Sequence, residues 1–321
     1  MVPPLSLAVA AGDAPATPRP HLQRLLDRAR ALGPLPVAVA YPCDAGSLQA
    51  ALQAAQDGLV TPLLVGPRAR IEAAARAAGL PLDGLAIHET EDEPRAAAAR
   101  AAALCGSGQA RALMKGSLHS DELLAAAVAR ETGLRGSRRA SHVFVMDLPE
   151  YERPLLMTDC VVNISPTLMD KRDIAQNAID LARAIGIAQP RVAVLSAVET
   201  VNPAIPGTID AAALCKMADR GQISGAMLDG PLAYDNAISL RSARHKGIVS
   251  EVAGRPDILL APGLEAGNMI YKQLVYMAGA ECAGIVLGMR VPVVLTSRSD
   301  SVPSRIASCA LAVLAAAGEQ P

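Results

Sequence analysis

The sequence is poor in aromatic side chains: its 321 residues include no Trp, one Phe and five Tyr. Platforms on which nucleic-acid bases could stack are therefore scarce. The net charge is −1, and no basic block offers a stripe of charge to a phosphate backbone. We therefore expect no nucleic-acid partner. Apolar residues still make up 51% of the chain, so the core must be aliphatic, which suits helices layered on a buried parallel sheet.

Paired cysteines and long apolar runs are also missing. The six Cys residues form no CxxC motif and have no His at ligand spacing, which is typical of free buried thiols in a reducing cytoplasm. No segment reaches the roughly 18 apolar residues of a membrane-spanning helix, and the first residues lack the positive charge of a signal peptide. We therefore expect a cytoplasmic protein with no membrane partner and no metal.

Strand-like and helix-like segments alternate along the chain, which predicts an α/β fold with a parallel, doubly wound sheet. The strands expected in the first half are 34–42, 61–67, 85–88 and 112–114. In the second half, 141–148 and 155–163 read as neighbouring strands joined by a short loop, followed by strands at 191–198 and 223–232. Asp44 is expected to cap a helix over 45–57, and a helix is expected over 235–246.

The chain is longer than one core usually requires, so two lobes are expected. The final helix, 303–317, is expected to return to the first lobe. We assign residues 1–147 and 291–321 to that lobe and residues 148–290 to the second.

A first candidate site follows the strand at 112–114. Lys115, Gly116 and Ser117 stand between this strand and a helix that starts near Ser120. A helix N-terminus beside an ammonium group is a suitable anion site, although a helix cap beside a solvated lysine would have the same sequence. His119 could act as a base there or could be structural. Another basic loop, with Arg135, Arg138 and Arg139, could supply guanidinium groups to a phosphate if it faces the same site.

The stretch 256–308 contains two further candidate positions, each at the end of a predicted strand, where open α/β sheets bind their ligands. In LEAGNMIYK (264–272), Asn268 and Lys272 are four residues apart and so share one helix face, beside a predicted Gly turn. In LTSRSDS (295–301), Ser297, Arg298 and Asp300 follow a strand. A guanidinium group there can stabilise an oxyanion and a carboxylate can accept a proton. A surface Arg–Asp pair that caps a helix is the alternative.

Several blocks of the sequence resemble the phosphate acetyltransferase/phosphate butyryltransferase family. These blocks are MKGSLHSDELLAAAV, MTDCVVNISPT, DGPLAYDNAIS, HKGIVSEVAGRPDILLAPGLEAGNMIYKQL and AGIVLGMRVPVVLTSRSDS, and the similarity extends over about residues 34–318. The chain is also similar to the transferase half of fused enoyl-CoA hydratase/phosphate acetyltransferase proteins, although it has no hydratase lobe. The resemblance implies two α/β/α lobes of the isocitrate/isopropylmalate dehydrogenase type, with a central cleft and a homodimer formed mainly through the second lobe.

The implied reaction is reversible transfer of a short acyl group, acetyl or butyryl, between CoA and inorganic phosphate, without metal or redox cofactor. The family's cleft Ser-Arg pair corresponds to Ser297 and Arg298. The catalytic Asp of the acetyl-specific members falls on Ser304, whereas butyryl-like members read Ser-Arg-Ala-Asp-Ser and match Asp300, which we select as the base. An Arg that the acetyl-specific members carry near Ala125 is absent here. Lys115, His119 or the arginines at 135–139 would then bind phosphate.

Two other classes of function stay open on the sequence. A hydroxy-acid dehydrogenase of the same fold would use NAD and a metal, and would need a carboxylate cluster that the strand ends do not show. A non-catalytic acyl-CoA or acyl phosphate sensor would account for the two departures from the family pattern. The length of the acyl chain is not encoded in any motif, because one methylene changes selectivity by only about 1–3 kcal/mol.

Overall fold

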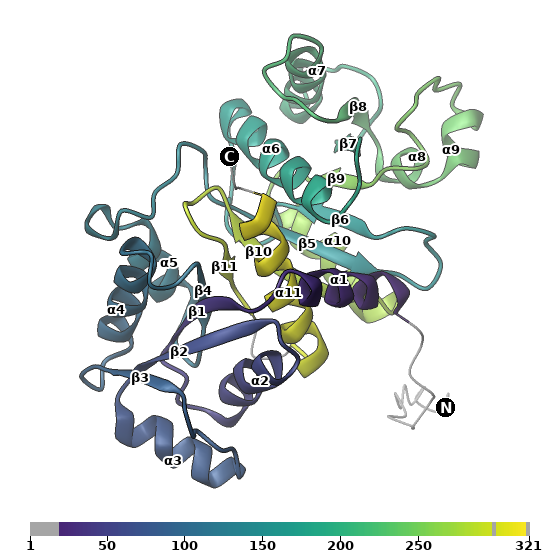
Figure 1. The fold of residues 1–321 in the computed structure, drawn as a ribbon. Coiled ribbons are helices and arrows are strands. Elements are labelled where there is room, and N and C mark those ends of the chain that lie inside the picture. The colour runs from purple at the N-terminus through teal and green to yellow at the C-terminus, as the bar shows by residue number, and fades with distance from the viewer. Residues whose placement is uncertain (1–18, 297–299, 319–321) are drawn as a thin grey trace, which may run out of the picture.

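The computed structural model describes residues 19–296 and 300–318, which form an α/β fold around one mixed sheet (Figure 1). The strands are β1 Leu35–Ala40, β2 Val60–Gly66, β3 Ala86–Glu89, β4 Ala112–Lys115, β5 Ser141–Asp147, β6 Leu155–Thr158, β7 Arg191–Leu195, β8 Met227–Leu232, β9 Ile258–Leu260, β10 Glu281–Leu287 and β11 Val293–Val294. The helices are α1 Pro20–Ala31, α2 Ala45–Gln56, α3 Arg68–Ala78, α4 Pro94–Gly106, α5 Ser120–Val128, α6 Leu168–Ala184, α7 Pro206–Asp219, α8 Tyr234–Ile238, α9 Leu240–His245, α10 Leu264–Met277 and α11 Val302–Gly318, with a 3₁₀ turn, η1, at Arg130–Thr132.

The sheet has eleven strands in the order β3-β2-β1-β4-β11-β10-β5-β6-β9-β7-β8. Strands β3, β2, β1, β4 and β11 are parallel, as are β6, β9, β7 and β8. Strand β10 is antiparallel to both β5 and β11, and β5 is antiparallel to β6. The predicted α/β class is confirmed, and so is the parallel arrangement of the first four strands. The sheet as a whole is mixed rather than parallel.

Most predicted elements form for the local reasons that the sequence indicates. Asp44 caps α2, because its carboxylate accepts a hydrogen bond from Ser47 N at 2.8 Å. The single helix expected over 235–246 is wrong. Ser239 is extended between α8 and α9, and its hydroxyl accepts from Ser242 N at 3.3 Å to cap the second of these two helices.

The Gly turn expected near Asn268 is also wrong, because Gly267 and Asn268 lie inside α10. Gly267 is required there by close packing: a Cβ atom at this position would lie 2.6 Å from the carbonyl oxygen of Asp159. Glycine at this point therefore allows α10 to approach the loop after β6, and it does not mark a turn.

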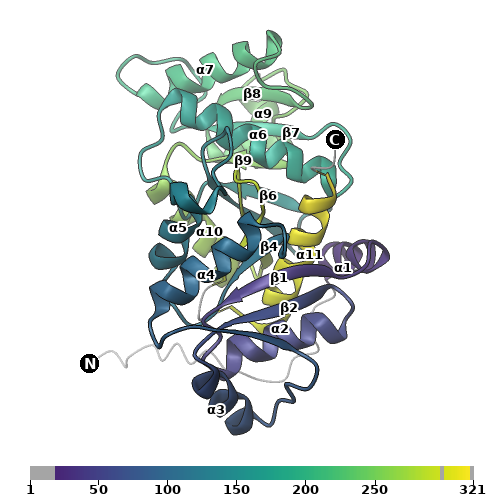
Figure 2. The same cartoon turned by 60° about the vertical axis from the view of Figure 1, so that its left-hand side comes forward.

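The aliphatic core is divided unequally between the two faces of the sheet. One face carries a continuous cluster to which α1, α2, α6 and α11 contribute. The other face carries two separate clusters, one beneath α4 and α5 and one beneath α8, α9 and α10. Figure 2 shows the resulting elongated molecule, with α7 at one end and α3 at the other. The exact division into lobes stays a prediction.

Helix α11 lies across the middle of the shared face. It packs against α2 and β11 of the first half, and also against α6 and β10. The expected return to the first lobe is therefore only part of its packing, because α11 joins both halves (Figure 1). Within 19–296 and 300–318, no helix is both long and apolar enough to cross a membrane.

Candidate active site

Strands β1, β4 and β11 are adjacent and parallel, so their carboxyl-terminal ends lie side by side. A cavity of about 400 Å³ opens at these strand ends. Parallel strands place their carboxyl-terminal loops at a common edge, where α/β proteins bind ligands. The cavity is lined by Asp44, Gly46, Lys115, Gly116, Ser117, Thr296 and Arg305. It therefore contains two of the predicted substrate-binding residues, Lys115 and Ser117, and it also includes Thr296, which directly precedes the predicted Ser297 and Arg298 in the sequence.

Lys115 is the last residue of β4, and its side chain is buried at the cavity with only 6% of the residue exposed. Its ammonium group donates to the carbonyl oxygen of Leu118 at 3.4 Å. Burial of a cation is costly unless hydrogen bonds or negative charges stabilise it. The positive charge of Lys115 lies on the wall of the cavity and attracts anions, so its position agrees with a phosphate site.

Ser117 holds the cavity wall together. Its hydroxyl donates to the carbonyl oxygen of Tyr41 at 2.8 Å and accepts from Cys43 N at 3.0 Å. Tyr41 has a φ of +53°, a left-handed conformation that is uncommon for a bulky residue. The preceding Gly116 packs against the same turn. Ser117 therefore fixes the loop after β1, which carries Asp44, and its hydroxyl already has two protein partners.

Arg305 is the cavity residue that the sequence interpretation missed. It lies in the first turn of α11, and its Nε donates to the carbonyl oxygen of Asp300 at 3.3 Å. Its guanidinium also lies near Gly46 at the start of α2, where a Cβ atom would be 3.4 Å from Nη1. The sequence does contain a signal for it, because Arg305 lies one helical turn after Ser301, close to the candidate residues at 297–300. Only the fold shows that this turn faces Lys115.

Asp300 lies close to α10 as well as to the cavity. Burial raises the pKa of the Cys282 thiol to about 12, and the negative charge of Asp300 adds to this effect. The pKa of Tyr271, on α10, is raised by burial and by the charges of Cys282 and Asp300. The fold thus brings the loop after β11 near the helix that carries Asn268 and Lys272. Ser297 and Arg298 lie outside the described residues.

The remaining predicted residues are outside the cavity lining. Asn268 is half-buried and donates from its amide to the carbonyl oxygen of Cys160 at 3.1 Å, whereas Lys272 is exposed on α10. His119 is exposed at the start of α5, where its backbone N–H donates to the Glu122 carboxylate at 2.9 Å. Arg135 is exposed and forms an isolated bridge with Met289.

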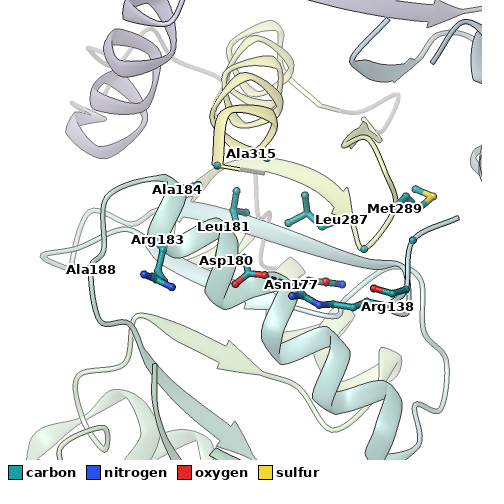
Figure 3. Close-up of a pocket in the computed structure, with 14 residues that line it drawn as sticks. Arg138, Asn177, Asp180, Leu181, Arg183, Ala184, Ala188, Leu287, Met289 and Ala315 are labelled. Carbon is teal, nitrogen blue, oxygen red and sulfur yellow. Dashed lines mark hydrogen bonds and ion pairs between the residues drawn. The ribbon is translucent and has the colours of Figure 1, made fainter. Parts of the chain in front are cut away.

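A second and larger cavity, of about 740 Å³, lies at the end of β10 and between α6 and α11 (Figure 3). Arg138 and Asp180 form an ion pair on its wall, beside Asn177, and Leu181 and Leu287 contribute apolar surface. Arg138 is one of the loop arginines expected to bind phosphate, but it lies in this cavity and not in the one that Lys115 lines. Among the described residues, no group of three or more His, Cys, Asp or Glu side chains is arranged to hold a metal ion.

Comparison with known proteins places this arrangement in a family. Residues 95–313 match the family model described as "Phosphate acetyl/butaryl transferase". A phosphate acetyltransferase from Rhizobium meliloti is 56% identical over 305 residues, which cover 94% of this chain and 95% of that protein. A phosphate butyryltransferase from Clostridium acetobutylicum is 42% identical over 280 residues, covering 87% and 93%.

A solved structure of a phosphotransacylase supports the same family. The crystal structure of a branched-chain phosphotransacylase from Enterococcus faecalis superimposes with a TM-score of 0.76 at 30% identity, covering 88% of this chain and 99% of that one. The sequence relatives and this structural match extend over nearly the whole chain. The protein therefore belongs to the phosphate acetyl/butyryl transferase family.

Proposed function

We propose that the protein transfers a short acyl group reversibly between CoA and inorganic phosphate. The observation that carries this proposal is 56% identity to a phosphate acetyltransferase over nearly the full length of both chains. The acetyltransferase relative is more similar than the butyryltransferase relative, at 42% identity, which favours acetyl as the acyl group. CoA is then a substrate, and the chemistry requires no redox cofactor.

Phosphate is proposed to bind in the 400 Å³ cavity, between Lys115 and Arg305. Two cationic side chains and one carboxylate, that of Asp44, line this space, so its charged groups favour an anion. The planar guanidinium of Arg305 can bind two phosphate oxygens at once, and Lys115 adds a buried point charge. Ser117 shapes this cavity. His119 and Arg135, which are exposed, would reach substrate only if it extends beyond the cavity.

The acyl-transfer step is proposed to occur beside the loop after β11. A phosphate oxygen attacks the thioester carbonyl carbon, and the C–S bond breaks as the tetrahedral intermediate collapses. The departing CoA sulfur takes up the proton that phosphate loses, by way of Asp300. Arg298 stabilises the oxyanion, and Ser297 places the sulfur. In the reverse direction, Asp300 takes the proton from the CoA thiol so that its sulfur can attack acyl phosphate. The proximity of Asp300 to Tyr271 supports a cleft between this loop and α10, with Asn268 and Lys272 on the CoA side.

The whole molecule is proposed to have two α/β/α lobes of the isocitrate/isopropylmalate dehydrogenase type, divided at 147/148 and 290/291. The separation of the core beneath α4 and α5 from that beneath α8–α10 supports this division. We further propose a homodimer formed through the second lobe. Of the twelve large apolar residues exposed within the described chain, ten lie after residue 148, including Met269, Tyr276 and Met277 on α10.

The test is a thiol-release assay with acetyl-, propionyl-, butyryl- and longer acyl-CoAs, each with and without phosphate. Phosphate-dependent release of CoA, fastest for a short acyl group, is expected. Binding of CoA in calorimetry without any such release would instead indicate an acyl-CoA sensor. Reduction of NAD with a hydroxy acid, followed by absorbance, would indicate a dehydrogenase.

A further inference from the structure

The antiparallel strand β10 brings a carboxylate to the edge of the sheet at which the candidate site lies. Because β10 runs opposite to β11, its first residue, Glu281, lies at the end of the sheet where the candidate site opens, beside Ser301 and Ser304. Glu281 is outside the lining of the cavity and is half-buried. Its carboxylate lies next to the N-terminus of α11.

Two serine hydroxyls converge on one oxygen of this carboxylate. Ser301 Oγ donates to Glu281 Oε1 at 2.8 Å, and Ser304 Oγ donates to the same atom at 2.7 Å. Ser301 is also the N-cap of α11, because its Oγ accepts from Ser304 N at 3.1 Å. A further link follows one turn later, where Ser308 Oγ donates to Ser304 O at 2.8 Å and accepts from Gly284 N at 3.0 Å. The start of α11 is therefore attached to β10 through its serines.

Along the chain, the two serines that bind Glu281 lie between Asp300 and Arg305, the two proposed functional residues. Asp300 directly precedes Ser301, and Arg305 directly follows Ser304. Arg305 also donates to the backbone of Asp300 at 3.3 Å, so the three hydrogen-bonded side chains and Asp300 form one unit. Hydrogen bonds to a carboxylate are stronger than neutral ones, and the N-terminus of a helix favours negative charge. Glu281 is thus suited to hold this unit in one position.

We propose that Glu281 is a positioning residue for acyl transfer, which acts through Ser301 and Ser304 to fix the N-terminus of α11 and with it Asp300 and Arg305. The proposal deepens the proposed function and rests on it. Glu281 itself is not assigned proton transfer, because both serine hydroxyls donate to its Oε1. A misplacement of about 1 Å in reacting groups can lower a rate by roughly 10², which sets the size of the expected effect.

The test compares Glu281→Ala, Glu281→Gln and the double variant Ser301→Ala/Ser304→Ala with wild type, and Glu251→Gln on the exposed surface serves as the control. Glu281→Ala and the double serine variant should each lower kcat by roughly 10–10². Combining them should add little, because both remove the same attachment. Glu281→Gln keeps an acceptor oxygen and should restore most of the rate. The pH–rate profile should keep its acidic limb in every variant, because the proposed base, Asp300, is unchanged.

Three results would overturn the proposal: an unchanged kcat in Glu281→Ala, additive effects of the Glu281 and serine changes, or loss of the acidic limb of the pH profile in Glu281→Gln. The last would make Glu281 the base. If wild type releases no CoA with phosphate, the proposed function fails instead. Hydrogen exchange then still tests the attachment, since Glu281→Ala should speed exchange of the first α11 amides, and an unchanged exchange rate would refute it.

Discussion

Two cationic side chains, those of Lys115 and Arg305, define the candidate site. Lys115 is at the end of β4 and Arg305 is in the first turn of α11, separated by almost two hundred positions in the chain, yet both line one cavity. Lys115 was selected from its sequence context, a strand followed by a small-residue turn and a helix. Arg305 could not be, because a helix pattern does not show which strand end the helix faces.

Removing the charge at Lys115 should weaken phosphate binding. Lys115→Met retains the length and apolar character of the stem and removes only the charge. We expect the KM for phosphate to rise about tenfold or more, equivalent to roughly 1.4 kcal/mol or more of binding free energy. The KM for acyl-CoA should change much less. Initial rates at varied phosphate measure this, with Lys216→Met on the exposed end of α7 as control. An unchanged KM for phosphate would exclude Lys115 from the phosphate site.

Because of His142, the free energy of unfolding should depend on pH. Its side chain is buried on β5 against Phe144, and its Nδ1 has no hydrogen-bond partner among the described residues. Burial lowers the pKa of His142 well below 6.5, against an opposing effect of Asp159. The unfolded chain therefore takes up the proton first as pH falls. The contribution of neutral, buried His142 to the free energy of unfolding is complete above pH 6.5. It is lost as pH falls toward the pKa of His142 in the folded state, by up to about 1.4 kcal/mol per pH unit.

Urea unfolding at pH 7.5 and pH 5 checks this expectation. His142→Phe should reduce the loss of stability between the two pH values, whatever its effect at pH 7.5. His245→Gln changes an exposed residue of α9 and should leave that loss as in wild type. An equal loss in wild type and in His142→Phe would show that another group is responsible.

At the scale of elements, the turn after β4 is packed too tightly for any side chain. A Cβ atom at Gly116 would lie 2.3 Å from the carbonyl oxygen of Ala40 and 2.5 Å from that of Tyr41, and both obstacles are backbone atoms. Gly116→Ala should therefore lower the free energy of unfolding by about 2–3 kcal/mol and displace Lys115 and Ser117. Gly207→Ala, in the first turn of α7 with its nearest contact at 3.4 Å, is the matched control and should be close to neutral.

Denaturant midpoints measure this pair of variants, and phosphate-dependent activity reports on the displacement. If Gly116→Ala were as stable and as active as Gly207→Ala, the tight contact between the β1 and β4 turns would not be needed for the site.

The elements themselves were largely predictable from local pattern, and their errors have local causes. The strands of the first half alternate with amphipathic helices, and the cap at Asp44 is a local hydrogen bond, so nearby residues predict both correctly. The sequence predicts a turn at Gly267, because the close packing of α10 on the loop after β6 is not visible in it. The antiparallel pairing of β10 with β5, which sets Glu281 opposite Asp147, joins segments far apart in the chain, and no local signal specifies it.

At the scale of the whole molecule, the proposed homodimer gives the exposed apolar side chains of the second half a partner. Met269, Tyr276 and Met277 lie on α10 and are 66%, 75% and 81% exposed. The double variant Tyr276→Glu/Met277→Glu should shift the protein from dimer to monomer in sedimentation velocity, because two charges would be buried at the interface. Val128→Glu, on an exposed apolar residue of the first half, should leave the dimer intact. A monomeric wild type at micromolar concentration would contradict the proposal.

Because the proposed reaction moves one acyl group from sulfur to phosphate oxygen, it can be tested by measuring both products in one reaction. With acetyl-CoA and phosphate, free CoA and acetyl phosphate should form in a 1:1 ratio, and neither should form without phosphate. Arg298→Gln should slow both by about 10²–10³, as expected when one oxyanion donor is lost. Release of CoA without acetyl phosphate would exclude acyl transfer to phosphate, and a near-normal rate in Arg298→Gln would exclude Arg298 as the oxyanion donor.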